Sequence, residues 1–267
     1  MLGTVEHHTS ATIDYTLMQP EQESDKLAVF IPGLATNRYG LTSGNEPALA
    51  VKDALIDVVG ATHNIVFPDI YGMSDLQPGE TVQSLVVEDQ GSRVLDVLES
   101  LATKTEITEL TLVSECLGSL VIASLANQIE VQGATALLWS PNTDEGESHR
   151  ISVITAFGGT EVDDQGNGFL PIAKGTGQVR VDIDLWNSMD RNSLRIYHDA
   201  MEAAYRRVIA IYQTEDPIYP QNGEYLAQHT PSFTRVPIPG NKHRFSKEPM
   251  KSALKQAMHN IIFGDTV

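Results

Sequence analysis

Short apolar runs recur along the chain and are separated by amphipathic segments. Six runs have the length and composition of buried strands, and they lie at 26–32, 63–68, 110–114, 134–140, 207–213 and 233–239. Runs that are apolar on both faces are typical of parallel strands covered by helices on both sides. The alternating polar and apolar residues at 4–8 and 12–18 instead predict an antiparallel hairpin at one edge of the sheet.

Between the strands, apolar residues recur at three- and four-residue spacing, which is typical of helices that pack one face on a sheet. The segments with this spacing are 46–59, 81–102, 117–129 and 247–263. Because strand and helix patterns alternate, the sequence predicts an α/β fold, with a mostly parallel sheet of about eight strands and helices on both faces.

The stretch 142–192 departs from this alternation. It is rich in glycine and aspartate and includes the strand-like segment 179–186. We therefore expect a core formed by residues 1–141 and 193–267, into which 142–192 is inserted as a small cap or lid.

Charge and cysteine content exclude several classes of partner. The 267 residues include 35 acidic and 18 basic side chains, for a formal net charge of -17 that is spread over many segments. Such a surface repels phosphate backbones and anionic lipids, so we expect no nucleic-acid partner and no stable membrane insertion. The single cysteine forms no internal disulfide, and neither a signal-peptide pattern nor an apolar stretch of bilayer-spanning length is present. A soluble, cytoplasmic protein is predicted, with its oligomeric state left open.

The lone cysteine, Cys116, falls between a predicted strand and a predicted helix. Ser114 and Gly118 flank it at two-residue spacing, and small residues there allow strand and helix to approach closely around a sharp turn. The N-terminal end of the following helix favours the thiolate form of a cysteine. The backbone N–H of Leu117, together with that of Leu34 after an earlier strand, is placed to bind an oxyanion. The alternative role for Cys116 is that of a small buried apolar residue.

An acid and a histidine follow Cys116, in the order nucleophile, acid, histidine. Asp216 comes after the fifth predicted strand, next to Glu215, and His243 comes just past the sixth. All three positions lie at the C-terminal ends of strands, where open parallel sheets bind their ligands. The other histidines show no metal-ligand spacing with a carboxylate or thiol, so we expect no metal and no cofactor.

With these motifs the chain resembles the α/β hydrolase family over nearly its whole length. The likeness rests on five segments in order, FIPGLATNRYG, FPDIYGMSD, SECLG, TEDPIYP and GNKHRF. They resemble the oxyanion-hole loop, a shortened DxxGxGxS segment, the GxSxG nucleophile turn, the acid loop and the histidine loop of the family. The second of them matches at Asp69, Gly72 and Ser74.

The resemblance implies a catalytic triad of Cys116, Asp216 and His243. The DxxxP spacing from Asp216 to Pro220 matches the family and favours Asp216 over Glu215. Two positions depart from the family's pattern, because Ser114 replaces the first glycine of the nucleophile turn and a cysteine replaces the usual serine. Cysteine at this position is similar to that of dienelactone hydrolases and some acyltransferases.

The implied chemistry is acyl transfer through a thioester. His243 takes the thiol proton, Asp216 orients the imidazole, and the thiolate attacks the carbonyl of an ester, thioester or lactone. The carbonyl oxygen becomes anionic at the N–H groups of Leu34 and Leu117, and water then releases the acid. A thiolate is also a good leaving group, which favours small-molecule substrates whose own leaving groups are good.

Specificity is expected from the insertion. Phe157 and Trp186 are apolar residues of this segment that either line an acyl pocket or pack the cap on the core. Three alternatives to a hydrolase stay open: an acyltransferase with the same triad, a noncatalytic small-molecule-binding homologue, and a serine enzyme into which the cysteine has been introduced.

Overall fold

The computed structural model describes residues 2–34, 46–71, 79–143, 147–171, 177–241, 243 and 248–264. Its centre is an eight-stranded sheet in the order β1-β2-β4-β3-β6-β7-β10-β11. These strands are β1 (Leu2–Thr9), β2 (Asp14–Pro20), β3 (Lys26–Ile31), β4 (Asn64–Pro68), β6 (Glu109–Glu115), β7 (Thr135–Trp139), β10 (Arg207–Gln213) and β11 (Thr234–Ile238). From β4 to β11 neighbouring strands pair in parallel, whereas β2 pairs antiparallel with both β1 and β4.

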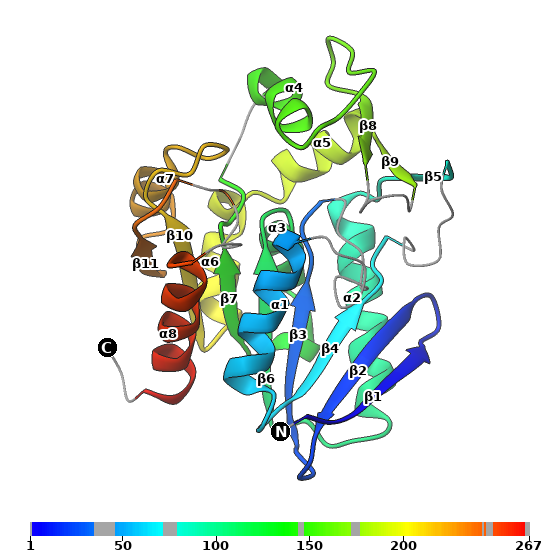
Figure 1. The fold of residues 1–267 in the computed structure, drawn as a ribbon, viewed down its shortest axis with the longest axis vertical. Coiled ribbons are helices and arrows are strands. Elements are labelled where there is room, and N and C mark those ends of the chain that lie inside the picture. Colours follow the sequence, from blue (N-terminus) through cyan, green and yellow to red (C-terminus); the bar gives the residue numbers. More distant parts are fainter. Residues whose placement is uncertain are drawn as a thin grey trace.

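Helices cover both faces of this sheet (Figure 1). One face is covered by α1 (Glu46–Val59) and α8 (Met250–Phe263), and the other by α2 (Val87–Ala102), α3 (Gly118–Leu125) and α6 (Leu194–Ala204). Leu55 and Leu254 pack with Phe30 and Trp139 on the first face, in a cluster separate from that of the second. Burial on both faces explains why the central strands read as continuous apolar runs.

A second, three-stranded sheet lies near the ends of the central strands, at the top of Figure 1. It consists of β5 (Thr81–Gln83), β9 (Gln178–Val181) and β8 (Gly168–Pro171), in that order, and the helices α4 (Glu147–Ala156) and α5 (Ile183–Arg191) flank it in sequence. β5 lies just before α2, whereas β8 and β9 come after β7. The pairing of β5 with β9 therefore joins the stretch after β7 to an earlier part of the chain through backbone hydrogen bonds. The Val87 N–H also donates to the Ser188 hydroxyl at 3.0 Å.

Three expected elements differ from the structure. The predicted helix over 81–102 is wrong at its start, because Thr81–Gln83 form β5 and α2 begins at Val87. The predicted helix over 117–129 ends at Leu125, and a single 3-10 turn, η2 (Ile129–Val131), follows. The strand-like segment 179–186 is half helix, since the Asp182 carboxylate accepts the Asp184 and Leu185 N–H groups and caps α5.

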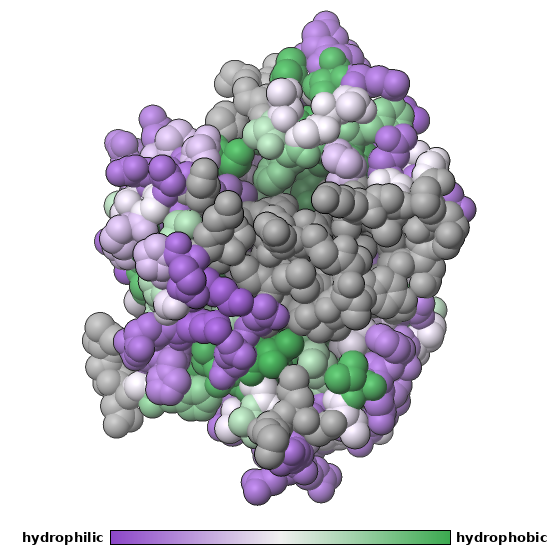
Figure 2. Space-filling view, in the orientation of Figure 1, coloured by the Kyte–Doolittle hydropathy of each residue, from purple (hydrophilic) through white to green (hydrophobic). Residues whose placement is uncertain are grey.

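The fold class predicted from the sequence is confirmed, as is the antiparallel hairpin at one edge of the sheet. α7 (Asn222–His229), like α4 and α6, was not predicted from the pattern. None of the described helices combines the length and the apolar composition that a bilayer crossing requires. In Figure 2, apolar (green) atoms gather near the top of the view, at the level of α4 and α5.

Candidate active site

Cys116 stands on a strained turn between β6 and α3. Its φ of 52° lies in the left-handed region, which costs a residue other than glycine about 1–2 kcal/mol. Neighbouring backbone holds it there, because the Cys116 N–H donates to the Trp139 carbonyl at 3.0 Å. The Cys116 carbonyl in turn accepts the N–H of Ser119 at 3.0 Å and of Asn142 at 3.3 Å. The turn therefore has the geometry of a nucleophile elbow, with its side chain fixed at the end of the strand.

Two glycines allow the backbone to pass close to this turn. A Cβ on Gly118 would lie 2.5 Å from the Ile31 carbonyl oxygen of β3, so only glycine fits between strand and helix. A Cβ on Gly33 would lie 3.2 Å from the Cβ of Cys116, which places the loop after β3 directly against the elbow. Ser114, the other small residue of the predicted motif, is fully buried in β6.

Replacing Gly118 with alanine should destabilise the fold, because the new methyl group collides with backbone that cannot move aside. We expect the free energy of unfolding to fall by about 1–3 kcal/mol in urea titrations. Gly91→Ala in α2 is the matched control, since its Cβ would meet side-chain atoms and not backbone, namely the Ser124 hydroxyl at 2.9 Å and a Leu125 methyl group at 3.4 Å, which can shift. Equal effects of the two substitutions would contradict the close approach at Gly118.

His243 and Asp216 form a buried pair. The imidazole Nδ1 lies 2.9 Å from one carboxylate oxygen of Asp216 and 3.2 Å from the other. The carboxylate also accepts the N–H of Ile218 at 2.8 Å and of Tyr219 at 3.1 Å, so its position is set by the loop after β10. Glu215, the competing acid in the sequence, is exposed to solvent. The structure therefore brings Asp216, and not its neighbour, to the histidine.

The His243 imidazole and the Cys116 thiol influence each other electrostatically. Burial by itself lowers the pKa of His243, but the negative charge of a Cys116 thiolate and the hydrogen bond with Asp216 raise that pKa to about 10. The imidazole Nε2 is buried and makes no hydrogen bond of standard geometry to the described residues. Such bonds are often loose before substrate binds. A protonated imidazole at this position would stabilise a thiolate beside it.

Two residues that the sequence analysis did not single out complete the surroundings of the pair. The Ser140 hydroxyl, just after β7, donates to the His243 backbone carbonyl at 2.6 Å and fixes the histidine loop. The Tyr219 hydroxyl lies 3.5 Å from the Cys116 Sγ. Both follow strands that end at this edge of the sheet, which is the only signal in the sequence that points to them.

The two predicted oxyanion-hole donors belong to the loop after β3 and to the start of α3, which both adjoin Cys116. Leu117 is the N-cap residue of α3, and Leu34 follows Gly33 in the loop that touches the elbow. Both side chains are buried. Within the described part of the chain neither backbone N–H donates a hydrogen bond, so both are available to an incoming carbonyl oxygen.

The segment resembling DxxGxGxS also reaches this region. Asp69 is buried, while Gly72 and Ser74 lie outside the described residues. The Tyr71 hydroxyl donates to the Gln90 side chain at 3.0 Å. Burial, and secondly the charge of the Cys116 thiolate, raise the pKa of Tyr71 well above its usual value. Tyr71 therefore lies within the electrostatic range of the sulfur.

The two residues predicted to bind substrate have different surroundings. The Phe157 ring meets the His243 ring edge-on, with centroids 5.8 Å apart, so it borders the triad. Trp186 is buried in α5, and its indole N–H donates to the Gly166 carbonyl at 2.9 Å. Among the described residues Trp186 shows no contact with the triad, and its hydrogen bond anchors the turn before β8.

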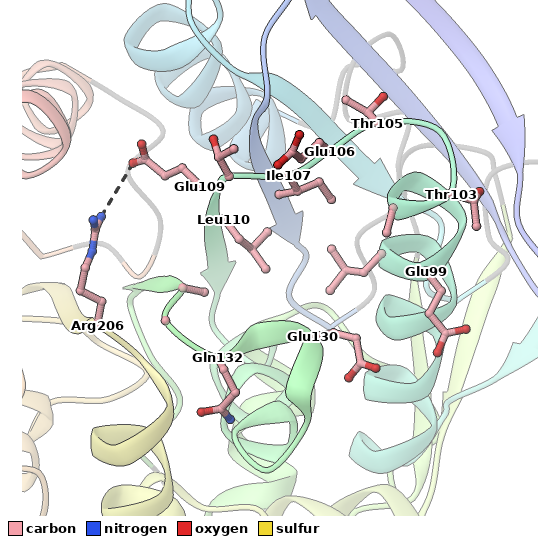
Figure 3. Close-up of a pocket in the computed structure, with 15 residues that line it drawn as sticks. Glu99, Thr103, Thr105, Glu106, Ile107, Glu109, Leu110, Glu130, Gln132 and Arg206 are labelled. Carbon is pink, nitrogen blue, oxygen red and sulfur yellow. Dashed lines mark ion pairs between the residues drawn. The ribbon is translucent and has the colours of Figure 1, made fainter.

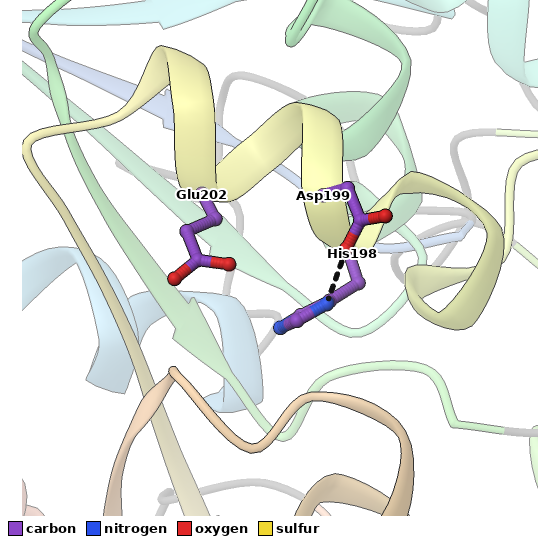
Figure 4. Close-up of side chains that lie close together, drawn as sticks. All are labelled: His198, Asp199 and Glu202. Atoms are coloured by element: carbon purple, nitrogen blue, oxygen red, sulfur yellow. Dashed lines mark hydrogen bonds and ion pairs between the residues drawn. The ribbon is translucent and has the colours of Figure 1, made fainter.

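One cluster elsewhere has residues of a metal-binding type. His198, Asp199 and Glu202 of α6 place their ligand atoms within 4.8 Å of one another (Figure 4). The imidazole nitrogens already have partners, since Nδ1 lies 3.1 Å from Asp199 and Nε2 lies 2.7 Å from the Ser232 hydroxyl. These bonds account for the cluster as a surface hydrogen-bond network.

A hollow of about 660 Å³ lies at the opposite end of the strands from Cys116 (Figure 3). It is bordered by the start of β6, with Leu98 and Leu110 among its apolar residues and with Glu99, Glu106 and Glu130 around it. Arg206 pairs with Glu109 there at 3.8 Å. The length of β6, about 20 Å, separates this hollow from Cys116. It is therefore not part of the triad's site.

Comparison with known proteins identifies the architecture. No family model matches the sequence, and no curated protein sequence does either. Solved structures are similar: Est1E from Butyrivibrio proteoclasticus (TM-score 0.59, 16% identity, 96% of this chain and 98% of that one covered) and the esterase domain of a Rhodothermus marinus protein (0.63, 12%, 97% and 98%). Mouse alpha/beta hydrolase domain-containing protein 10 is similar to the same degree (0.60, 16%, 97% and 98%). The chain has the α/β hydrolase fold.

Proposed function

We propose that this protein is an acyl hydrolase that cleaves carboxylic ester, thioester or lactone bonds through a Cys116–His243–Asp216 triad and an acyl-thioenzyme intermediate. The observation that supports it most is the buried Asp216 carboxylate 2.9 Å from the His243 imidazole, beside a tyrosine, Tyr219, that contacts both this imidazole and the Cys116 sulfur. A nucleophile, a base and an orienting acid in that order are what covalent acyl transfer requires. The esterases named above share the fold, which agrees with the proposal.

Acylation begins from the thiolate–imidazolium pair. The Cys116 sulfur attacks the substrate carbonyl and forms a C–S bond, while the carbonyl oxygen becomes anionic and accepts the N–H groups of Leu34 and Leu117. Collapse of this intermediate breaks the bond to the alcohol or thiol. The leaving group departs with the bonding electron pair and takes the proton held by His243. Asp216 keeps the imidazole oriented throughout through Nδ1.

Deacylation reverses these roles. His243, now neutral, removes a proton from water, whose oxygen attacks the thioester carbonyl. The same two backbone N–H groups donate hydrogen bonds to the new oxyanion. Expulsion of the Cys116 thiolate releases the carboxylic acid and restores the ion pair.

We also propose that residues 142–192 act as a cap over the core formed by 1–141 and 193–267. The contact between Phe157 and the His243 ring supports this assignment, as does the position of α4 and α5 above the strand ends. In this arrangement an acyl group binds beside Phe157, and Trp186 holds the cap's own structure. The apolar atoms at the level of α4 and α5 in Figure 2 suit an uncharged acyl chain.

A reducing compartment fits this mechanism. The nucleophile is the single cysteine of the chain, and a thiolate that is oxidised can no longer attack a carbonyl. We therefore propose the cytoplasm as the place where the enzyme acts, with a small-molecule acyl compound as its substrate.

A panel of p-nitrophenyl esters, alkyl esters and acyl thioesters tests the proposal, run with and without iodoacetamide. Hydrolysis that stops when Cys116 is alkylated supports the acyl-thioenzyme mechanism. Turnover that survives complete alkylation would contradict it. Product analysis in the presence of an added amine or alcohol separates a hydrolase from an acyltransferase, because only the latter passes the acyl group to the acceptor in preference to water. Ligand binding without turnover by any form indicates a binding protein.

The raised pKa of His243 predicts the alkaline side of the pH profile. An imidazole with a pKa of about 10 keeps its proton well above the ordinary value near 6.5. Acylation by an alkyl ester needs that proton for its leaving group, so kcat/KM should hold to about pH 9 and fall with a midpoint near 10. A p-nitrophenyl ester is the control, since its leaving group needs no proton and its rate should not fall there. A fall centred near pH 6.5 for the alkyl ester would contradict the ion pair.

A further inference from the structure

The Tyr219 side chain lies against the reacting sulfur. Its hydroxyl oxygen is 3.5 Å from the Cys116 Sγ, and either atom has the geometry to donate. Tyr219 comes three residues after Asp216, so the loop after β10 supplies both the acid of the triad and a hydroxyl group to its nucleophile. The side chain is 4% exposed, which shields this contact from water.

The position of the hydroxyl is fixed by the same residues that form the triad. The Tyr219 backbone N–H donates to the Asp216 carboxylate at 3.1 Å. Its ring meets the His243 ring edge-on, with centroids 5.1 Å apart and an angle of 70° between the planes. The tyrosine, the acid and the imidazole therefore form one packed unit around the sulfur.

The protonation state of the sulfur decides which atom donates. A thiol has a proton to give to the tyrosine oxygen, but a thiolate only accepts. An imidazolium at His243 favours the thiolate form of a neighbouring cysteine, and the proposed mechanism starts from that form. The Tyr219 O–H is then the donor. Tyr71, which also lies within the electrostatic range of the sulfur, donates its hydrogen bond to the Gln90 side chain instead.

We propose that Tyr219 is a further catalytic residue, whose hydroxyl donates a hydrogen bond to the Cys116 thiolate and makes the enzyme prefer acyl substrates with good leaving groups. The proposal rests on the proposed function. In the tetrahedral intermediate the substrate's leaving group and the Cys116 sulfur compete to depart with the bonding electrons. A hydrogen bond that stabilises the departing thiolate favours return to substrate. Leaving groups as good as a thiolate, such as thiols, phenols and enols, then complete acylation more often than the alkoxide of an alkyl ester.

Tyr219→Phe tests this inference, because it keeps the ring against His243 and removes only the hydroxyl. The chain has a single cysteine, so the rate of iodoacetamide alkylation between pH 4 and pH 10 reports on Cys116 alone. Loss of a hydrogen bond to a charged group should move the midpoint of that profile upward by about one pH unit. The preference for a thioester over the matching alkyl ester, measured as the ratio of kcat/KM values, should fall on the order of tenfold for the same reason.

Tyr205→Phe is the matched control. This buried tyrosine donates to the Ile122 carbonyl at 2.7 Å, so its variant also loses one buried hydroxyl, but away from the sulfur. Its alkylation profile and substrate preference should equal those of the unmodified protein. If Tyr219→Phe also shows the unmodified profile and preference, the inference is wrong even though the enzyme is active. If no form turns over any substrate, the proposed function fails, while a shifted alkylation midpoint still establishes the hydrogen bond.

Discussion

Replacing Cys116 with alanine should lower kcat for a p-nitrophenyl ester by a factor on the order of 10⁶ and leave the chain folded. The loss is this large because every later step depends on the covalent bond to the sulfur. The fold should persist, since alanine adopts the backbone conformation of cysteine and the backbone hydrogen bonds of the elbow remain. Steady-state kinetics measure the loss, and circular dichroism checks the fold.

A control for this substitution comes from the next helix. Ser124→Ala removes a similarly small polar group from α3. The Ser124 hydroxyl donates to the Val121 carbonyl at 2.8 Å, and its loss should leave kcat within a few-fold.

Cys116→Ser tests whether the cysteine is the enzyme's own nucleophile or replaces an original serine. A serine variant that is more active than the starting protein indicates a serine enzyme with a replaced nucleophile. Ester hydrolysis by Cys116→Ala at the unmodified rate would refute nucleophilic catalysis at this position.

Replacing His243 with alanine should reduce kcat by a factor on the order of 10⁵ to 10⁶, because acylation loses its proton donor and deacylation loses its base. Alkylation of Cys116 at neutral pH should also slow, since the thiolate loses the imidazolium that stabilises it. Both effects are measured on one preparation, by ester turnover and by iodoacetamide trapping. A loss of both would link His243 to the sulfur functionally, in addition to the electrostatic link between the two groups.

His259→Ala is the control for that experiment. His259 is an exposed residue of α8 whose ring lies tilted against that of Phe263, one turn further along the same helix. Its variant should retain full turnover and the unmodified alkylation rate. Equal activity of the His243 and His259 variants would show that the imidazole of the triad takes no part in the chemistry.

Features that depend on near neighbours in the chain could be predicted from the sequence. The turn at Cys116 is one, because a strand pattern, a small residue, a thiol, a glycine and a helix pattern follow each other within a few positions. The requirement for Gly118 then appears directly as the 2.5 Å approach to β3. The central strands were equally clear, since burial on both faces leaves long apolar runs.

Features that depend on distant residues could not be predicted. The contacts of Ser140 with His243 and of Tyr219 with the Cys116 sulfur each join groups 103 positions apart, and nothing in the local sequence indicates those partners. β5 is a strand because it pairs with β9, almost one hundred residues later, which overrides the helical spacing of the segment. The strand-like pattern of 179–186 ends at Asp182, and α5 follows directly because the Asp182 carboxylate caps a helix there.

The acyl-enzyme itself tests the central claim most directly. We would mix the protein with a p-nitrophenyl ester, quench in acid within the first turnover, digest, and measure peptide masses. The mechanism predicts one acyl group, attached to the peptide that contains Cys116 and released by hydroxylamine, and none in Cys116→Ala. Hydrolysis of the ester with no acyl group on that peptide, or with an acyl group on another residue, would contradict the mechanism.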